Sequence, residues 1–535
     1  MHRQLIQHQL KMQFRLKVKL FLILLLAMIR QGFAGDTLHV NTFNSIKLLK
    51  SDNAWLETEN IAGLVFNKSE IKADFEAGLD HGNGDLHRIR EGNNYNNFSF
   101  LTESYQTQKN RLYIYGRFAY HYVDDTGGQW NGTYDPYSGN PYILADSVSG
   151  ITYHKENYNL AGGVGYKLND RISLGCGADY FAGVAAKQKD PRPQNVYVRF
   201  TVNPALIFST ENYKIGVDLG YSNRKEEIEY DVFRSNFSPT FFTFKGFGFY
   251  TMDIGTGYFR FQKANRFFGG LQYDRNVAGI STLTELRFDY NLESIEDGTS
   301  VIRKLDGGDW STYGLVLREH ILIHKGLNNH HIKGIISFFN GDGNEFSQNI
   351  VYEGTWNVPK YITIAENLKF NRQTVSGTIY YNYQKMTDAC RINWDAEASI
   401  SYLTNDERYY YIPEVFTSGY ANVTANLSVQ KNLYFGKIHL ALSLNSGCTD
   451  NLSNDLQLST SPEITKKQRK DVYQQEFDYY TSGLFIAGGE IKLGGSLIKI
   501  KNVGQTYLSF RYDNIEQTNG IQSFRIISTK LGFVF

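Results

Sequence analysis

The chain has 535 residues, with 55 Lys and Arg against 54 Asp and Glu, and an aromatic content of 15% that includes 38 Tyr and 36 Phe. This near-neutral balance indicates no nucleic-acid partner. The 3 cysteines are too few for a disulfide framework, and beyond residue 34 no apolar run approaches the roughly 18 residues of a membrane-spanning helix.

The first 34 residues have the features of a secretory signal peptide. Residues 1–19 carry basic residues and no acidic one, and the apolar stretch Leu20–Ile29 follows. Gly32 and Ala34 are the small residues expected before a cleavage site. We predict that residues 1–34 are removed and that the protein is exported, because the apolar stretch is far shorter than the ~20 residues of a membrane anchor.

Residues 35–70 lack a regular alternation and are predicted to be an N-terminal lead-in segment, either periplasmic or lumenal, ahead of a first strand near Ile71. Residues 71–535 then alternate between apolar and polar side chains with the period of β-strands. In Tyr507–Asp513, for example, Leu508 and Phe510 alternate with Ser509 and Arg511.

One face of these segments is apolar and rich in aromatics, whereas the other is polar and carries charges of both signs. A closed sheet with lipid outside and water inside requires this inversion. We therefore predict an all-β fold: a closed antiparallel transmembrane β-barrel of roughly 16–20 strands in the cell outer membrane.

The connections between the predicted strands fall into two lengths. Residues 167–171 and 209–213 form short connections, which we predict to be periplasmic turns. The long connections are predicted to be extracellular loops, and they cover residues 121–150, 223–245, 291–311, 404–420 and 445–479.

The alternation assigns a set of ionisable side chains to the lumen. Rings of one sign would indicate an ion-selective pore, whereas mixed signs favour either cross-strand pairing or a polar passage with little charge preference. The lumen-facing set consists of Arg117, Arg199, Asp218, Glu285, Arg287, Arg391, Asp395, Glu397, Lys437, Arg511 and Asp513.

Four histidines cluster around one predicted hairpin, namely His320, His324, His330 and His331. Imidazoles gathered in this way could bind Zn, Cu or Ni. The plainer interpretation is that they are polar residues at a wet hairpin mouth, and we predict no metal or other cofactor.

The loop Asp124–Tyr142 offers Trp130, Tyr134 and Tyr137 as candidate ligand-binding residues. Aromatic faces can stack on sugars, and the neighbouring carboxylates could accept hydrogen bonds from hydroxyl groups. The alternative is a solvent-exposed structural loop, because Gly, Asn, Asp and Pro are also ordinary turn formers.

The chain ends on Phe535, with Phe533 two residues earlier on the same apolar face. This ending resembles the C-terminal signal by which the barrel-insertion machinery recognises outer-membrane proteins. We therefore interpret the two phenylalanines as an assembly signal on the last strand.

Five motifs carry a resemblance to a known family: "NAWL" (53–56), "NIAGL" (60–64), "WNGTYDPYSGNPYILADS" (130–147), "ENYNLAGGVGY" (156–166) and "DPRPQN" (190–195). With them the chain resembles a Bacteroidota outer-membrane β-barrel family known only as a domain of unknown function. The resemblance implies the fold, the location and an association with TonB-dependent uptake systems, but no catalytic residues. The chain is too short for a barrel of about 22 strands with a plug domain, and no segment reads as a plug.

These observations leave three functions open. The first is passage or capture of a nutrient or small solute, as an accessory to an uptake system. The second is a closed-lumen scaffold or surface-binding barrel that holds a partner on its long loops. The third, a barrel enzyme, has no supporting motif, so we predict a protein that is not an enzyme, a monomer with outer-membrane lipid around it.

Overall fold

The computed structural model describes residues 42–67, 71–109, 111–148, 150, 152–234, 236–255, 257–277, 279–300, 303–353, 358–388, 391–495 and 504–535. The predicted signal peptide, residues 1–34, and the first part of the predicted lead-in segment lie outside the described residues.

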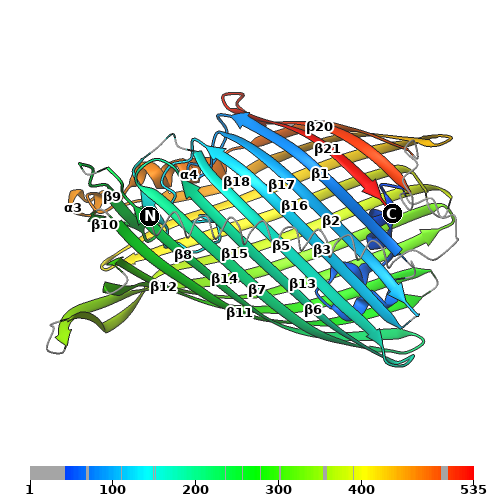
Figure 1. Ribbon diagram of the computed structural model, residues 1–535, viewed down its shortest axis with the longest axis horizontal. Coiled ribbons are helices and arrows are strands. Elements are labelled where there is room, and N and C mark those ends of the chain that lie inside the picture. Colours follow the sequence, from blue (N-terminus) through cyan, green and yellow to red (C-terminus); the bar gives the residue numbers. More distant parts are fainter. Residues whose placement is uncertain are drawn as a thin grey trace, which may run out of the picture.

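The described chain forms one closed antiparallel sheet of 18 strands. Each wall strand pairs with the next wall strand along the chain, and the last one, β21, pairs with the first one, β1. This result confirms the predicted barrel (Figure 1). The wall strands are β1 (Ile71–Gly84), β2 (Asn94–Gln108), β3 (Leu112–Thr126), β5 (Thr152–Lys167), β6 (Ile172–Lys187), β7 (Arg192–Ser209), β8 (Tyr213–Asp231), β11 (Gly257–Val277), β12 (Ile280–Ser300), β13 (Arg303–Lys325), β14 (Asn328–Glu353), β15 (Val358–Asp388), β16 (Arg391–Tyr411), β17 (Glu414–Phe435), β18 (Ile438–Gln457), β19 (Leu484–Gly495), β20 (Gln505–Gln517) and β21 (Ser523–Val534).

Alternation along each strand separates a lipid face from a lumen face. On β12, Leu286 and Phe288 are each 49% exposed, whereas Glu285 and Arg287 between them are 0% and 2% exposed. Apolar side chains on the outside and paired charges on the inside are the pattern of a transmembrane barrel, and closure leaves no unpaired backbone edge in lipid. The protein is thus an outer-membrane β-barrel.

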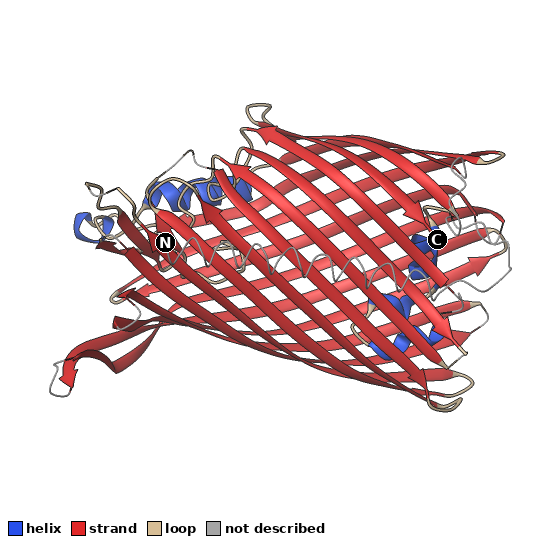
Figure 2. Ribbon diagram, viewed as in Figure 1, coloured by secondary structure: helices blue, strands red, loops and turns tan. Residues whose placement is uncertain are grey.

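The two ends of the barrel differ (Figure 2). We call the end where β1 begins and β21 ends the turn end, because short connections such as those between β5 and β6 or β17 and β18 lie there. The opposite end, the loop end, carries a three-stranded sheet of β4 (Leu144–Asp146), β9 (Thr240–Phe244) and β10 (Tyr250–Ile254), with helices α3 (Pro462–Thr465) and α4 (Lys470–Thr481). No helix in the described part of the chain is long and apolar enough to cross a membrane.

Two of the predicted long loops are instead extensions of the wall. Residues 291–300 and 303–311 pair with each other as continuations of β12 and β13, and residues 404–411 and 414–420 do the same for β16 and β17. The alternation fades in these segments because strands that project beyond the lipid need no apolar outer face, while cross-strand hydrogen bonding persists.

Candidate functional site

Residues 42–67 fold inside the barrel at the turn end, and we call them the plug. The plug consists of helix α2 (Ser45–Asp52) and two 3₁₀ helices, η1 (Ala54–Glu57) and η2 (Ile61–Phe66). Figure 1 shows these elements within the wall, at the end where the C-terminus lies. The described part of the predicted lead-in segment therefore packs against the inside of the wall.

Each of the two 3₁₀ helices begins directly after an asparagine: η1 after Asn53 and η2 after Asn60. The Asn53 side chain accepts a hydrogen bond from the backbone N–H of Trp55, and Asn60 accepts one from Ala62. Asn is a favoured residue for this capping role. The motifs "NAWL" and "NIAGL" therefore encode the local shape of the plug.

Helix η2 packs against two glycines of the wall, Gly163 on β5 and Gly175 on β6, which we call the seat of the plug. A Cβ added at Gly163 would lie 2.5 Å from Cδ1 of Ile61, and one added at Gly175 would lie 2.7 Å from Cα of Ala62. Such distances are far below van der Waals contact, so only glycine allows the plug to approach this closely. The glycines of the motif at 156–166 thus serve plug packing.

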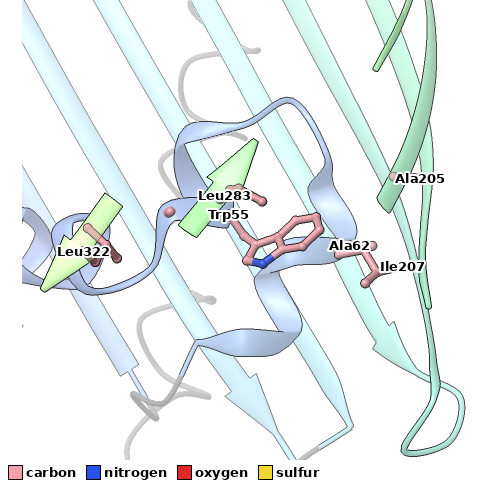
Figure 3. Close-up of a cluster of buried hydrophobic side chains, with 7 residues drawn as sticks. Trp55, Ala62, Ala205, Ile207, Leu283 and Leu322 are labelled. Atoms are coloured by element: carbon pink, nitrogen blue, oxygen red, sulfur yellow. The ribbon is translucent and has the colours of Figure 1, made fainter. Parts of the chain in front are cut away.

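Trp55 anchors η1 in an apolar cluster with side chains of the wall (Figure 3). The indole packs with Ile207 on β7 and Leu283 on β12, and its Nε1 donates a hydrogen bond to Oδ2 of Asp274 at 2.5 Å. Nearby, Nδ2 of Asn60 donates to Oε1 of Gln272 at 2.8 Å. This half of the plug is held by close packing and buried hydrogen bonds.

Helix α2 is held by apolar packing and by ion pairs. Leu48 is buried with Ile392 of β16, and Leu49 is buried with Tyr105 and Tyr113 of β2 and β3. Nζ of Lys47 lies 2.7 Å from Asp395 and 2.6 Å from Glu397 on β16, and Lys50 lies 2.8 Å from Glu103 on β2. Both halves of the plug are therefore packed against the wall, and α2 adds charged contacts to this packing.

Two cavities border the plug. The larger, of about 620 Å³, is lined by four carboxylates, those of Glu57, Glu59, Glu103 and Asp179, and by two ammonium groups, those of Lys50 and Lys333. The second, of about 390 Å³, lies between α2 and the strands β14 to β16. The excess of carboxylates in the larger cavity favours neutral or cationic solutes over anions.

The lumen-facing set is largely paired. Nη1 of Arg318 donates to Glu285 at 2.6 Å, Arg199 pairs with Asp179 at 2.9 Å, and Arg511 pairs with Asp513 at 2.5 Å. Asp218 accepts a hydrogen bond from Gln272 at 2.5 Å, and Arg287 lies 3.4 Å from Asp289.

The remaining members of the set differ in position. Arg117 donates to Asn159 at 3.3 Å, and the guanidinium of Arg391 lies over the Tyr434 ring. Asp395 and Glu397 hold Lys47, as described above. Lys437 is not on the wall, because the chain turns between β17 and β18 at Gly436, with φ +58°, and leaves Lys437 exposed in the turn.

The four histidines do not converge. His320 lies 3.6 Å from Glu57 of the plug, and His324 and His331 form an edge-to-face pair with ring centroids 6.3 Å apart. His330 bonds to the hydroxyl of Tyr381, which is exposed on the opposite face of the wall. Among the described residues no group of three or more His, Cys, Asp or Glu is arranged to hold a metal ion.

The loop-end elements pack together as one unit, which we call the cap: residues 127–148, 236–255 and 458–483. Tyr134 stacks on Tyr197 of the wall with centroids 4.9 Å apart, Trp130 packs edge-on against Phe242, and Tyr137 lies under the guanidinium of Arg88. The three candidate ligand residues are therefore half-buried in contacts with the cap and the rim of the wall. A role in ligand binding stays a prediction.

Helix α4 joins the cap to the rim of the wall. Arg90 pairs with Glu476 of α4 at 3.0 Å, and the hydroxyl of Tyr473 bonds to Glu407 on β16. A cavity of about 190 Å³ beside these contacts is lined by Arg372, Glu407 and several tyrosines. Burial outweighs the attraction of Arg90 and raises the pKa of the Glu476 carboxyl above its ordinary value.

The closed wall, the plug and the cap define the class of protein: a transmembrane β-barrel with packed chain segments at both ends. The chain belongs to a family described as a family of unknown function, whose profile matches residues 61–535. This finding confirms the coarser part of the resemblance, whereas the link to Bacteroidota stays a prediction.

Among curated proteins none matches this chain. Three solved structures are similar in fold. They are a copper transporter, OprC (9% identity, 87% of this chain and 81% of that chain, TM-score 0.40), the outer membrane transporter YddB from Escherichia coli (7%, 88% and 81%, 0.39), and the ferric citrate transporter FecA in the unliganded form (10%, 86% and 78%, 0.38).

Proposed function

We propose that this protein is a gated outer-membrane transporter that admits a small neutral or cationic solute, acts as an accessory to a TonB-dependent uptake system, and uses the plug as its gate. The observation that carries the proposal is the position of the plug inside the barrel beside two cavities. Helix α2, which borders both cavities, is joined to the wall by ion pairs of Lys47 and Lys50 as well as by the buried side chains of Leu48 and Leu49.

Helix α2 is the part of the plug whose displacement would join the two cavities to each other. Its ion pairs can be exchanged for pairs with a solute, whereas the burial of Leu48 and Leu49 would keep the resting state closed. In this proposal the turn end faces the periplasm and the loop end faces the medium.

The cap favours a second candidate, the closed-lumen scaffold. Phe247, Phe370 and Tyr409 form a buried aromatic cluster with other cap and rim side chains, which would keep the loop end closed. In that case the cap surface would hold a partner and nothing would cross the lumen. Neither candidate assigns a chemical reaction to the protein.

Planar-bilayer recording separates the two candidates. We expect the full protein to be closed and a variant lacking residues 42–67 to give steady current steps and to let vesicles swell in small sugars. Heat-modifiable migration in a gel would establish that both barrels are assembled. A silent but assembled deletion variant would support the scaffold, and steady current through the full protein would show that the plug is no gate.

A further inference from the structure

The second cavity beside the plug, of about 390 Å³, has the size of a small-molecule pocket. We call it the plug-side pocket. On the plug side it is lined by Lys47 and Lys50 of α2 and by Glu57 of η1. On the wall side it is lined by Asp74 of β1 and by side chains of β14, β15 and β16, among them His331, Lys333, Gln384 and Glu397.

Two buried side chains in this pocket, His331 and Gln384, lie beside each other and have no hydrogen bond of normal geometry. His331 is 1% exposed and Gln384 is 0% exposed, and both line the cavity. Neither ring nitrogen of His331 and neither side-chain polar atom of Gln384 makes a hydrogen bond of normal geometry with the described part of the chain. Buried polar groups are nearly always satisfied, so these four atoms indicate a polar occupant.

The neighbouring carboxylates supply the charge preference. Asp395 and Glu397 are brought together on β16, and Nδ2 of Asn382 donates to Asp395 at 2.5 Å, which fixes the pair. Nζ of Lys47 lies within 2.7 Å of both carboxylates. Although burial acts to lower the pKa of Lys47, the two carboxylates raise it above its ordinary value, so the side chain stays an ammonium ion.

Lys47 thus occupies a site that would accept any primary ammonium group of suitable reach. Two carboxylates around one ammonium group leave one negative charge unbalanced, and both negative charges are unbalanced once Lys47 moves away. A free amine in the pocket would therefore compete directly with the plug for the same oxygen atoms. Its remaining polar groups would lie near His331 and Gln384.

We propose that the plug-side pocket binds a small molecule with a primary ammonium group, which replaces Lys47 on Asp395 and Glu397 and thereby breaks the charged contact of α2 with β16. This inference rests on the proposed function, because it names the class of solute and one contact that breaks when the plug moves. Lys47 acts as an internal competitor that is present at high effective concentration.

Equilibrium dialysis of the full protein in detergent micelles tests the proposal, with radiolabelled ethanolamine as the probe and unlabelled ethylene glycol as a neutral competitor of similar size. We expect ethanolamine to bind and the glycol not to displace it. Lys47→Ala should bind ethanolamine about tenfold more tightly than the natural protein, because it removes the tethered competitor. Glu397→Gln should lose the binding.

Lys50→Ala is the matched control. Lys50 lies on the same helix with similar exposure and also lines the pocket, but its partner is Glu103 on β2. Its removal leaves Lys47 on Asp395 and Glu397, so it should strengthen ethanolamine binding far less than Lys47→Ala does. His331→Leu should weaken binding without changing barrel assembly. Equal affinity in the Lys47 and Lys50 variants, or binding that survives Glu397→Gln, would overturn the proposal.

The result is independent of the conductance experiment. A silent deletion variant would remove the transport function but would leave ethanolamine binding to be measured. Conversely, absence of ethanolamine binding in every variant would overturn the ammonium site while a conducting deletion variant still supported the gate.

Discussion

Ala62 of the plug lies directly on Gly175 of the wall, so closely that a Cβ added at Gly175 would come within 2.7 Å of the Ala62 Cα. Gly163 on the adjacent strand β5 faces Ile61 in the same way. The wall and the plug are therefore complementary in shape at this point, and a side chain on either glycine would separate them.

Replacing Gly175 by Leu should push η2 off its seat, because overpacking of this kind typically costs about 1–3 kcal/mol. We expect steady current through a variant whose barrel is otherwise assembled. Gly116→Leu is the control, since a Cβ at Gly116 meets nothing within 4 Å. If both variants stay as silent as the natural protein, the seat does not keep the lumen closed.

A disulfide should lock the plug in place. A Cβ added at Gly177 would lie 3.7 Å from Cβ of Ile61, close to the ~3.8 Å typical of disulfides. In a Cys176→Ser background, Ile61→Cys with Gly177→Cys should remain closed in moderate urea when oxidised and should open when a reductant is added. Each single cysteine variant should open under both conditions; opening of the oxidised pair would place the moving element elsewhere.

The attachment of α4 should depend on pH through Glu476. Its pKa is raised by burial, so the folded cap binds this proton more tightly than the unfolded chain does. The protonated carboxyl stabilises the folded cap at acidic pH. This stabilisation is lost as the pH rises from 4.5, the ordinary pKa of the group, through its raised pKa in the folded protein. Hydrogen exchange of α4 amides, corrected for intrinsic rates, should therefore be slower at pH 4.5 than at pH 8, and Glu476→Gln should remove the difference.

Deletion of Phe535 should reduce the yield of assembled barrel. The backbone of Phe535 exchanges hydrogen bonds with Ala73 on β1, with N–O distances of 2.9 and 3.4 Å. Loss of both costs about 1–3 kcal/mol at the seam, besides any loss of recognition by the insertion machinery. The amount of heat-modifiable protein in the membrane fraction measures the effect. The control Phe535→Tyr keeps the backbone and the aromatic ring and should assemble normally.

Strand alternation was sufficient to predict the wall. Leu286 and Phe288 face lipid and Glu285 and Arg287 face the lumen, as their positions in the sequence require. The pattern failed at Ile392, which is buried with Leu48 of the plug although alternation places it outside. A register shift between β15 and β16 near Met386 explains the difference, and no residue type in this segment indicates a bulge.

The plug could not be predicted from periodicity because its helices are short and irregular. Its signal lay elsewhere, in the capping asparagines Asn53 and Asn60 and in the glycines of β5 and β6. Each of these has an ordinary local explanation, and their common purpose emerges only when the barrel brings them together. The same holds for Lys47 and Glu397, which are 350 residues apart in sequence.

The seam between β1 and β21 bears on how the molecule is built. The plug precedes β1 in the chain, whereas β21 is the last strand to be made, so the cylinder cannot close until the segment it will enclose already exists. Assembly can therefore proceed by wrapping. The sheet forms around the helices of the plug, and the last hydrogen bonds to form are those that join β21 to β1. No part of the chain then has to be threaded through a finished ring.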